Sequence, residues 1–394
     1  MNLPAAARYL DGSEVEELLQ VAVAHAGATL RSAERRSIHT RAGRSVSHVF
    51  EARLAAGEVE RDVLLVAHAD RKPSPDGAFE LERDGARVAI WRFPFDPYLL
   101  GLPSAIDRGR VRELLDDLGA PGGQVSLRTR AYRPSRRAVV EVTITSQQQV
   151  GRILYLKVLA GDRASELASI HRALQDHVPV PRVIGVAAAQ GIVALEALEG
   201  ATLRSALVQG DALPDPASIV GLSHRFAASG LEGRRDPRRF ADPRRHVDGL
   251  IRLAPERASA IEEVVTAAAQ VSGPLVAVHG DLHDGQLLLQ DREVTGLLDV
   301  DGSGVGYLAH DAGNLIAHVE AIGHLWPEAA ERSRAYAASI REAYAEEVEA
   351  AQLSRAIAGA WLGLATGPYR AQEEGWLHAT RRRIDRALEV MQEA

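Results

Sequence analysis

The amino-acid sequence predicts an α+β protein of more than one domain, in which two strand-rich blocks precede a mostly helical C-terminal half. Three observations support this prediction. The chain has 394 residues, more than one hydrophobic core usually serves, so two or three cooperating domains are expected. Apolar and polar residues alternate within 46–91 and again within 125–158, as half-buried strands require. From Leu203 onward apolar residues recur at helical spacing, apart from one strand-like island at 275–300.

The composition excludes several classes of protein. The chain contains no cysteine, which excludes a disulfide framework, a thiolate nucleophile and a zinc–cysteine site. Its net charge of −7 argues against general binding of nucleic acid, which needs a basic face. The sequence has no run of about 18 apolar residues, and its first ten residues lack the features of a signal peptide. We therefore expect a cytoplasmic protein that interacts with neither nucleic acid nor a membrane.

The distribution of basic residues singles out one lysine. Of the 46 basic residues, only Lys72 and Lys157 are lysines and the other 44 are arginines. A lysine kept in such a background raises the question of what arginine cannot do there, because lysine is a compact point charge and arginine a planar fork. Chance survival is the alternative explanation for either residue.

The first block of elements is a helix followed by a small antiparallel sheet and a second, short helix. Ser13 and Glu16 form a capping-box pattern at the start of the first helix. The turn-like sequence at 83–85 separates two strands, and an aromatic, proline-containing loop follows at 93–97. The second helix is expected at 110–118. The alternating segments lie at 46–54, 63–67 and 88–91.

The second block contains a hairpin, a lysine-bearing strand and a helix. Residues 133–137 form the basic turn Arg-Pro-Ser-Arg-Arg of the hairpin. The next strand, 153–158, carries Lys157, and the helix expected at 163–177 carries Glu166. The strands of this block are expected at 125–132, 138–144, 153–158, 183–186 and 192–198.

The segment that carries the most chemistry lies within the strand-like island. A loop rich in histidine, aspartate and glycine, His279 to Gln286, lies between two apolar strands, and a third strand ends in Asp299 and Asp301. Carboxylates at the ends of apolar strands are costly to desolvate unless a cation meets them. Carboxylate and amide oxygens together with a substrate phosphate describe a magnesium site.

These motifs resemble those of the aminoglycoside phosphotransferase and choline kinase branch of the protein-kinase-like superfamily. His279-Gly280-Asp281 is similar to the family's catalytic loop, and Leu298-Asp299-Val300-Asp301 to its metal-binding strand. Gln286 stands where most of the family has asparagine, a form similar to the maltokinase and bacterial sugar or glucosamine kinase subgroup. The resemblance covers roughly 125–394. It implies a bilobal kinase-like fold with a sheet-rich cap (1–120), an N-lobe (121–200) and a mostly helical C-lobe (201–394), with ATP between the lobes.

The resemblance also implies roles for particular residues in phosphoryl transfer. Asp281 would orient the acceptor hydroxyl and accept its proton. Gln286 and Asp299 would hold Mg2+ against the phosphates of ATP. Lys157 would contact the α- and β-phosphates, and Glu166 would position Lys157. Asp301 is expected to bind a second metal ion or to brace the strand.

Further residues follow from the same comparison of motifs. The segment around Glu196 and Leu198 resembles the hinge that meets the adenine edge. Ser135 in the glycine-free hairpin turn would cover the phosphates, unless this turn is an ordinary basic hairpin tip. Asp311 is expected to brace the catalytic loop through backbone N–H groups. His283 and Asp284 are expected to face the acceptor.

Two aromatic residues near the C-terminus are candidates for the acceptor site. Tyr369 and Trp376 occur close together in a chain that is only 5% aromatic. Because sugars stack on aromatic faces, these side chains could form a wall of the acceptor site; packing in the core is the alternative.

The predicted reaction is transfer of the γ-phosphoryl group of ATP to a hydroxyl of a small polar acceptor. A sugar or amino sugar is the expected acceptor, as in a metabolic sugar kinase. An acidic pocket of Asp281, Asp284, Asp299 and Asp301 would also suit a cationic aminoglycoside, so an antibiotic phosphotransferase is an alternative. A nucleotide-binding pseudokinase without turnover is another. The sequence does not distinguish a monomer from a homodimer.

Overall fold

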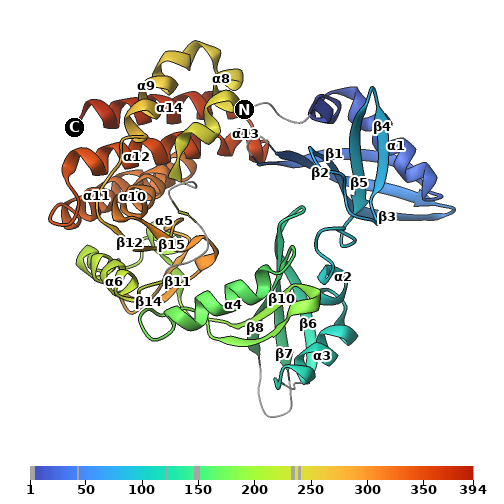
Figure 1. Ribbon diagram of the computed structural model, residues 1–394, viewed down its shortest axis with the longest axis horizontal. Helices are drawn as coiled ribbons and strands as arrows, with labels where there is room; N and C mark the ends of the chain where they lie inside the picture. Colours follow the sequence, from blue (N-terminus) through green and yellow to red (C-terminus); the bar gives the residue numbers. More distant parts are fainter. Residues whose placement is uncertain are drawn as a thin grey trace. The chain divides into compact units, whose positions relative to one another are not determined.

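The computed structural model describes residues 5–41, 44–120, 123–145, 151–231, 236–237 and 241–393. It confirms the predicted fold class, because the N-terminal half is rich in strands and the C-terminal half is mostly helical (Figure 1). The chain forms two compact units. Unit 1 comprises 1–166, 184–196 and 369–374, and unit 2 comprises 167–183, 197–368 and 375–394. The cap, N-lobe and C-lobe division remains a prediction.

The first sheet of unit 1 is antiparallel and has the strand order β1-β2-β3-β5-β4. Its strands are β1 (Thr29–Arg41), β2 (Ser45–Ala56), β3 (Val59–Asp70), β4 (Phe79–Arg83) and β5 (Ala86–Arg92). The 3-10 helix η1 (Ala5–Leu10) and α1 (Ser13–His25) pack on it, with Leu10, Leu19 and Phe50 in the shared core. The sequence analysis did not predict β1, because in this charged strand only Ile38 is fully buried.

The second sheet of unit 1 has the order β6-β7-β8-β10-β9. Its strands are β6 (Gln124–Arg133), β7 (Arg137–Thr145), β8 (Arg152–Leu159), β9 (Val183–Ala187) and β10 (Ile192–Glu196). Between the two sheets in sequence lie α2 (Leu102–Ala105) and α3 (Arg108–Asp117); the latter is the predicted short helix. The chain continues from β8 into α4 (Arg163–Leu174), and η2 (Ala188–Gln190) joins β9 to β10.

A glycine is required where β10 begins. Gly191 has φ 66°, a left-handed conformation that side chains rarely adopt. A Cβ atom there would lie 2.4 Å from the carbonyl oxygen of Leu159. The carbonyl oxygen of Gly191 also accepts a hydrogen bond from the Leu159 N–H at 2.8 Å. The close approach of these two backbones fixes the end of the lysine-bearing strand β8.

The described part of unit 2 contains two small sheets and most of the helices. One sheet joins β11 (Ala201–Thr202), β13 (Leu287–Gln290) and β14 (Glu293–Leu297), and the other pairs β12 (Leu275–Val278) with β15 (Gly304–Tyr307). The predicted strand-like island at 275–300 contains β12, β13 and β14. The longer helices α10, α12 and α14 pack together. The helices are α5 (Leu203–Gln209), α6 (Pro216–Ala228), α8 (Val247–Leu253), α9 (Ala258–Ala268), α10 (Leu308–Leu325), α11 (Ala330–Ala343), α12 (Ala350–Ala365), α13 (Gly367–Ala371) and α14 (Trp376–Gln392).

Four short 3-10 helices complete the connections of unit 2: η3 (Pro243–His246), η4 (Pro255–Arg257), η5 (Val300–Gly302) and η6 (Pro327–Ala329). Among the described residues, every helix is too short or too polar to cross a membrane.

Candidate active site

The loop between β12 and β13 is held in place by a buried carboxylate. Asp311 of α10 accepts hydrogen bonds from the backbone N–H groups of His279, at 2.7 Å, and Gly280, at 2.8 Å. Burial raises the pKa of the Asp311 carboxyl, and its two N–H donors act in the opposite direction. This is the bracing contact that the sequence predicted. Gly280 has φ 81°, and a Cβ atom there would lie 2.6 Å from the carbonyl oxygen of Gly302.

His279 links its loop to a neighbouring segment. Its side chain is 2% exposed, and its Nε2 lies 2.9 Å from the carbonyl oxygen of Leu298, to which it donates a hydrogen bond. Leu298 directly precedes Asp299, so the histidine ties the loop to the segment that carries the predicted metal-binding carboxylates. This arrangement fixes two parts of the site against each other.

Asp281 lies between two fixed points of the backbone. Gly280 on one side is held by Asp311, and the carbonyl oxygen of Leu282 on the other accepts a hydrogen bond from Asn314 Nδ2 at 2.9 Å. Asp281 itself is exposed. The loop therefore presents a carboxylate to solvent on a rigid backbone, as a group that orients an acceptor hydroxyl must be presented.

The charge of Arg245, in η3, interacts with that of Asp281, which the sequence analysis did not predict. Burial lowers the pKa of the Arg245 guanidinium, and the charges of Asp281 and Asp242 raise it. The positive charge of Arg245 partly offsets the negative charge of Asp281, the predicted catalytic residue. No motif in the sequence marks Arg245, which is separated from Asp281 by more than thirty residues.

Gln286 has a side chain that suits a metal ligand, and the backbone places Asp299 near it. Gln286 is 3% exposed, and its side-chain oxygen Oε1 is buried without a hydrogen-bond partner among the described residues. The backbone N–H of Leu298 donates to the carbonyl oxygen of Gln286 at 2.9 Å, which brings the neighbouring Asp299 to the same place. Asp299 has the left-handed φ of 60°, and Asp301 is 7% exposed. An amide oxygen that has no hydrogen-bond partner in the described part of the chain fits a hard cation such as Mg2+. The metal-binding roles of Gln286, Asp299 and Asp301 remain predictions.

Asp284 is the buried partner of an ion pair with Arg204. It is fully buried, and Arg204 of α5 donates to both carboxylate oxygens, from Nε at 2.6 Å and Nη2 at 3.2 Å. Burial alone would raise the pKa of the Asp284 carboxyl, but the hydrogen bonds of His283 and Arg204, together with the charge of Arg204, outweigh burial and hold it far below its usual range. Arg204 neutralises Asp284, which therefore adds little to the negative charge of the site. Direct contact between Asp284 and an acceptor remains a prediction.

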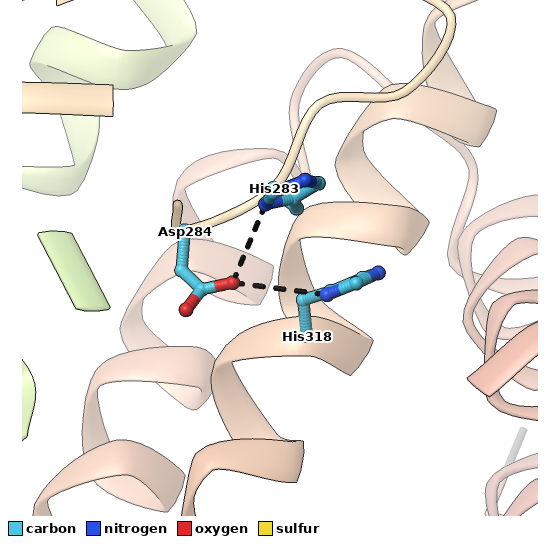
Figure 2. A group of neighbouring side chains, drawn as sticks. All are labelled: His283, Asp284 and His318. Carbon is cyan, nitrogen blue, oxygen red and sulfur yellow. Dashed lines mark ion pairs between the residues drawn. The ribbon is translucent and has the colours of Figure 1, made fainter. Parts of the chain in front are cut away.

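Two histidines lie beside Asp284. The rings of His283 and His318 stack at 4.7 Å, and the Nδ1 atom of each lies 3.7 Å from Asp284 Oδ1 (Figure 2). Burial and the neighbouring His283 lower the pKa of His318 to about 3, so its ring is neutral. The His283 side chain is 22% exposed, and its predicted contact with the acceptor is untested.

The group His283, Asp284 and His318 is not arranged as a metal site, although its ligand atoms lie within 4.8 Å of one another. The backbone N–H of Gly285 already donates to His283 Nδ1 at 3.0 Å. Both oxygens of Asp284 are bound to Arg204. A metal ion would have to displace these donors and lie beside a guanidinium.

Unit 1 contains most of the residues predicted to hold the nucleotide. Lys157 of β8 is 8% exposed, and Glu166 of α4 is half-buried. Their predicted ion pair remains an expectation. Ser135 is 8% exposed, with φ 59°. Glu196 ends β10, and its Oε1 lies 3.9 Å from Arg152 Nη2. The boundary between the units follows Glu196, so Leu198 belongs to unit 2.

The two aromatic candidates are not brought together as neighbours within one unit. Tyr369 belongs to unit 1 and packs against the core of the first sheet, whereas Trp376 begins α14 in unit 2 and is half-buried. The nearby Trp361 is 1% exposed, and its indole N–H donates to Glu320 at 3.2 Å, as expected of a core residue. The aromatic wall of the acceptor site therefore remains a prediction.

A family model confirms the resemblance seen in the sequence. The model of the phosphotransferase enzyme family, APH, matches residues 139–349. This match spans more than half of the chain, and the chain belongs to that family. The protein is thus a phosphotransferase, and the predicted ATP-dependent small-molecule kinase is confirmed at that level. No curated protein matches the chain.

Several solved structures are similar to the chain in fold. A thermostable mutant of aminoglycoside phosphotransferase APH(4)-Ia, in its apo form, is 16% identical, with 70% of this chain and 97% of that chain covered and a TM-score of 0.49. Macrolide 2'-phosphotransferase type I is 18% identical, with 70% and 96% covered and a TM-score of 0.43. Choline kinase from Cryptosporidium parvum Iowa II is 10% identical, with 68% and 89% covered and a TM-score of 0.44.

Proposed function

We propose that this phosphotransferase transfers the γ-phosphoryl group of ATP to a hydroxyl of a small sugar or amino sugar. The observation that carries the proposal is the loop from His279 to Gln286. In it the backbone on both sides of the exposed Asp281 is fixed by Asp311 and Asn314, and the buried oxygen of Gln286 has no hydrogen-bond partner among the residues that the structure describes. The loop offers one carboxylate for the acceptor and one amide oxygen for a cation. Phosphoryl transfer requires that kind of positioning and little covalent chemistry from the protein.

The reaction assigns a role to each residue. Asp281 orients the acceptor hydroxyl and takes its proton while the acceptor oxygen forms a bond to the γ-phosphorus. The bond between that phosphorus and the β,γ-bridging oxygen breaks, and ADP leaves. Gln286 and Asp299 would hold Mg2+, which neutralises charge on the phosphates. Lys157 would contact the α- and β-phosphates, and Glu166 would position it.

The charges around the catalytic loop support an acceptor with few positive charges. The sequence suggested an acidic pocket of four aspartates. Arg204 neutralises Asp284, the charge of Arg245 partly offsets that of Asp281, and Asp301 is almost completely buried. A polycationic aminoglycoside would gain less from this loop than the sequence implied. A neutral sugar or a sugar with one amino group fits better.

An ATP-consumption screen with Mg2+ tests the proposal across sugars, amino sugars, aminoglycosides and amino alcohols. Wild-type protein should release ADP in an acceptor-dependent manner, with a sugar or amino sugar as the best acceptor. Asp281→Asn should lower kcat by at least about a hundredfold and retain nucleotide binding. Nucleotide binding without acceptor-dependent turnover would identify a pseudokinase instead, and a clear preference for aminoglycosides would identify an antibiotic phosphotransferase.

A further inference from the structure

His318 is the third member of a row of side chains on α10 that contact the loop from His279 to Gln286. Asp311 and Asn314 precede it by seven and four residues, and such positions share one face of a helix. Both of these residues hydrogen-bond to the backbone of the loop. His318 instead stacks its ring on that of His283 and makes no hydrogen bond to any described residue. Its ring nitrogens are therefore not used to hold the loop.

The imidazole rings of His283 and His318 lie side by side in similar orientations (Figure 2). Their planes are inclined by only 16°. The Nδ1 atom of each ring faces the same carboxylate oxygen of Asp284, at 3.7 Å. The Nε2 atom of each ring points away from Asp284 (Figure 2). The pair therefore presents two Nε2 atoms on the same side, next to each other.

The protein itself uses only the Nδ1 side of His283. The backbone N–H of Gly285 donates to this nitrogen at 3.0 Å, whereas Nε2 has no hydrogen-bond partner among the described residues. The side chains of His283 and His318 are 22% and 21% exposed, so both are partly open to solvent. A small molecule can therefore contact both rings.

A second helix fixes the residue that both Nδ1 atoms face. Arg204 of α5 binds both carboxylate oxygens of Asp284, and its backbone N–H donates to the Asp284 carbonyl oxygen at 3.2 Å. Gly285 leaves room for this arrangement, because a Cβ atom there would lie 3.0 Å from the ring of His283 and 3.4 Å from Nη2 of Arg204. The position of the His283 ring is thus defined by α5, by α10 and by the loop itself.

A pair of imidazoles suits a ligand that carries several hydroxyl groups. A neutral imidazole has one N–H donor and one acceptor nitrogen, and a hydroxyl can both donate and accept. Each ring can therefore bind a hydroxyl through Nε2 in either tautomer. The ring of His318 is neutral, since burial and the charge of His283 lower its pKa to about 3. A cationic ligand would gain little here, because Arg204 already neutralises Asp284.

The imidazole pair is close to the predicted catalytic carboxylate along the chain. His283 follows Asp281 by two residues, so their Cα atoms lie at most about 7 Å apart. A sugar ring with its substituents extends over a similar distance. An acceptor whose reacting hydroxyl lies at Asp281 therefore has further hydroxyl groups within reach of the neighbouring part of the loop.

We propose that His318 determines acceptor specificity, in that its Nε2 and the Nε2 of His283 bind two hydroxyl groups of the sugar that do not react. This inference rests on the proposed function for the class of acceptor. His318 lies on α10 and belongs to none of the sequence motifs. Arg204 and Asp284 act as positioning residues through His283.

Steady-state kinetics of the full chain test the role of His318, with glucose, glucosamine, galactose and maltose as probes. His318→Phe keeps a flat ring for the stack and removes both nitrogens. It should raise the KM for the best of these sugars at least fivefold, and change kcat and the Kd for MgADP less than twofold, because only uniform binding of the acceptor is lost.

His324→Phe is the matched control for this substitution. His324 lies on the same helix, but its ring packs against Trp361, with the ring centroids 5.2 Å apart. The control should change the KM for the sugar less than twofold. A wild-type KM in His318→Phe, or an equal rise in both variants, would overturn the inference.

Two further substitutions identify the nitrogen that matters, and they also serve if His318→Phe does not fold. The side-chain amide of glutamine reaches as far as Nε2 of histidine, and that of asparagine only as far as Nδ1. His318→Gln should therefore keep the KM for the sugar within threefold of wild type, whereas His318→Asn should raise it at least fivefold. Equal KM values in the two variants would refute the role of Nε2.

NMR of isotopically labelled imidazole nitrogens gives a measurement that needs no turnover. The full chain is titrated with each of the four sugars in the presence of MgADP, and the signals are assigned from His283→Gln and His318→Gln. The Nε2 signals of His283 and His318 should shift with at least one sugar, and those of His324 should not. No shift of either signal with any of the four sugars would overturn the inference.

These measurements separate the inference from the proposed function. If wild-type protein transfers phosphate to a sugar and His318→Phe has the wild-type KM, the inference is wrong and the function stands. If a sugar shifts both Nε2 signals and wild-type protein turns over no acceptor, the binding site is supported and the proposed function is wrong.

Discussion

At the scale of single residues, Gln286 is notable because a polar side chain lies in a buried place that does not satisfy its oxygen. Its side-chain oxygen is buried and has no hydrogen-bond partner in the described part of the chain. Such a group costs about 1–3 kcal/mol, so it persists where something else uses it. Because Asp299 lies nearby, we expect a bound cation to interact with this oxygen.

Replacing Gln286 by leucine should separate stability from activity. Without metal, the free energy of unfolding should stay equal to wild type or rise by about 1 kcal/mol, because an unpartnered oxygen is removed. Turnover should fall at least tenfold, and the Mg2+ concentration needed for half-maximal rate should rise. Denaturant unfolding and Mg2+ titration of the rate measure both effects. Gln209→Leu, at an exposed position of α5, is the control. An unchanged Mg2+ requirement would show that Gln286 is not a ligand.

The carboxylate of Asp311 should be needed for its shape as well as its charge. Asparagine at this position offers one acceptor and one donor to the two N–H groups of His279 and Gly280, so one contact becomes repulsive. We expect Asp311→Asn to lose about 1–3 kcal/mol of unfolding free energy. The kcat should fall while the Kd for MgADP changes little. A variant with normal kcat would contradict the bracing role.

The buried pair of Asp284 and Arg204 should also matter for stability. Asp284→Asn leaves the guanidinium of Arg204, which is 41% exposed, with a weaker partner. A loss of about 2 kcal/mol is expected in denaturant unfolding. Asp62→Asn removes one partner of an exposed pair and should leave stability almost unchanged. Equal effects of the two substitutions would mean that burial adds nothing to the pair.

Sequence reasoning found the residues that lie close together along the chain. The loop from His279 to Gln286 and the carboxylates at 299 and 301 form a local pattern, and Asp311 follows within a recognisable stretch. Arg204, Arg245 and His318 were missed, because their partners are separated from them by tens of residues and only the tertiary fold brings them together.

At the scale of elements, the helices and the apolar strands could be predicted, whereas the polar edge strands could not. The strands β7 and β8 alternate cleanly or are continuously apolar. The edge strands β1 and β4 consist mostly of polar and charged residues, and the sequence shows no clear alternation between apolar and polar positions in them. Their pairing with β2 and β5 is decided by tertiary contacts.

The start of β10 offers a test of backbone packing. Gly191→Ala places a methyl group against the Leu159 carbonyl oxygen and also forces a left-handed φ. Gly57→Ala, in the turn between β2 and β3, imposes a similar φ of 62° with open space around the Cβ. The control should lose about 1–2 kcal/mol of unfolding free energy, and Gly191→Ala clearly more. Equal losses would mean that the backbone shifts freely.

Three histidines give the first sheet an expected dependence on pH. Burial is the largest cause that lowers the pKa of His39, His48 and His68, each to about 4. In the unfolded chain histidine titrates near 6.5, so only the unfolded state takes up these protons as pH falls below that value. The stability of this sheet is therefore complete above about pH 6.5 and is lost progressively towards pH 4.

Hydrogen exchange of β2 and β3 measures this loss between pH 7 and pH 5. His48→Leu removes one of the titrating groups at a position that is 3% exposed. The pH-dependent loss of protection in this variant should be smaller than in wild type. The exposed His378→Leu is the control and should retain the wild-type slope. Equal slopes in all three proteins would assign the acid sensitivity to other groups.

At the scale of the whole molecule, the family membership comes from the second sheet and the helical part, since the matched region begins at residue 139. The first sheet precedes that region. The turn after β6 nevertheless depends on Asp96 and Trp91, which lie before it. Trp91 and Asp96, which precede the matched region, are thus hydrogen-bonded to the turn between β6 and β7, in the predicted N-lobe.

The segment 369–374 has a consequence for any attempt to divide the protein. It is flanked by unit 2 in sequence, but it belongs to unit 1, where Gln372 accepts a hydrogen bond from Arg35 at 2.9 Å and Tyr369 packs on the first sheet. The polypeptide passes between the units five times. No single scission therefore yields either half intact, and an expression fragment ending near residue 200 would leave bare the apolar surface that Tyr369 covers.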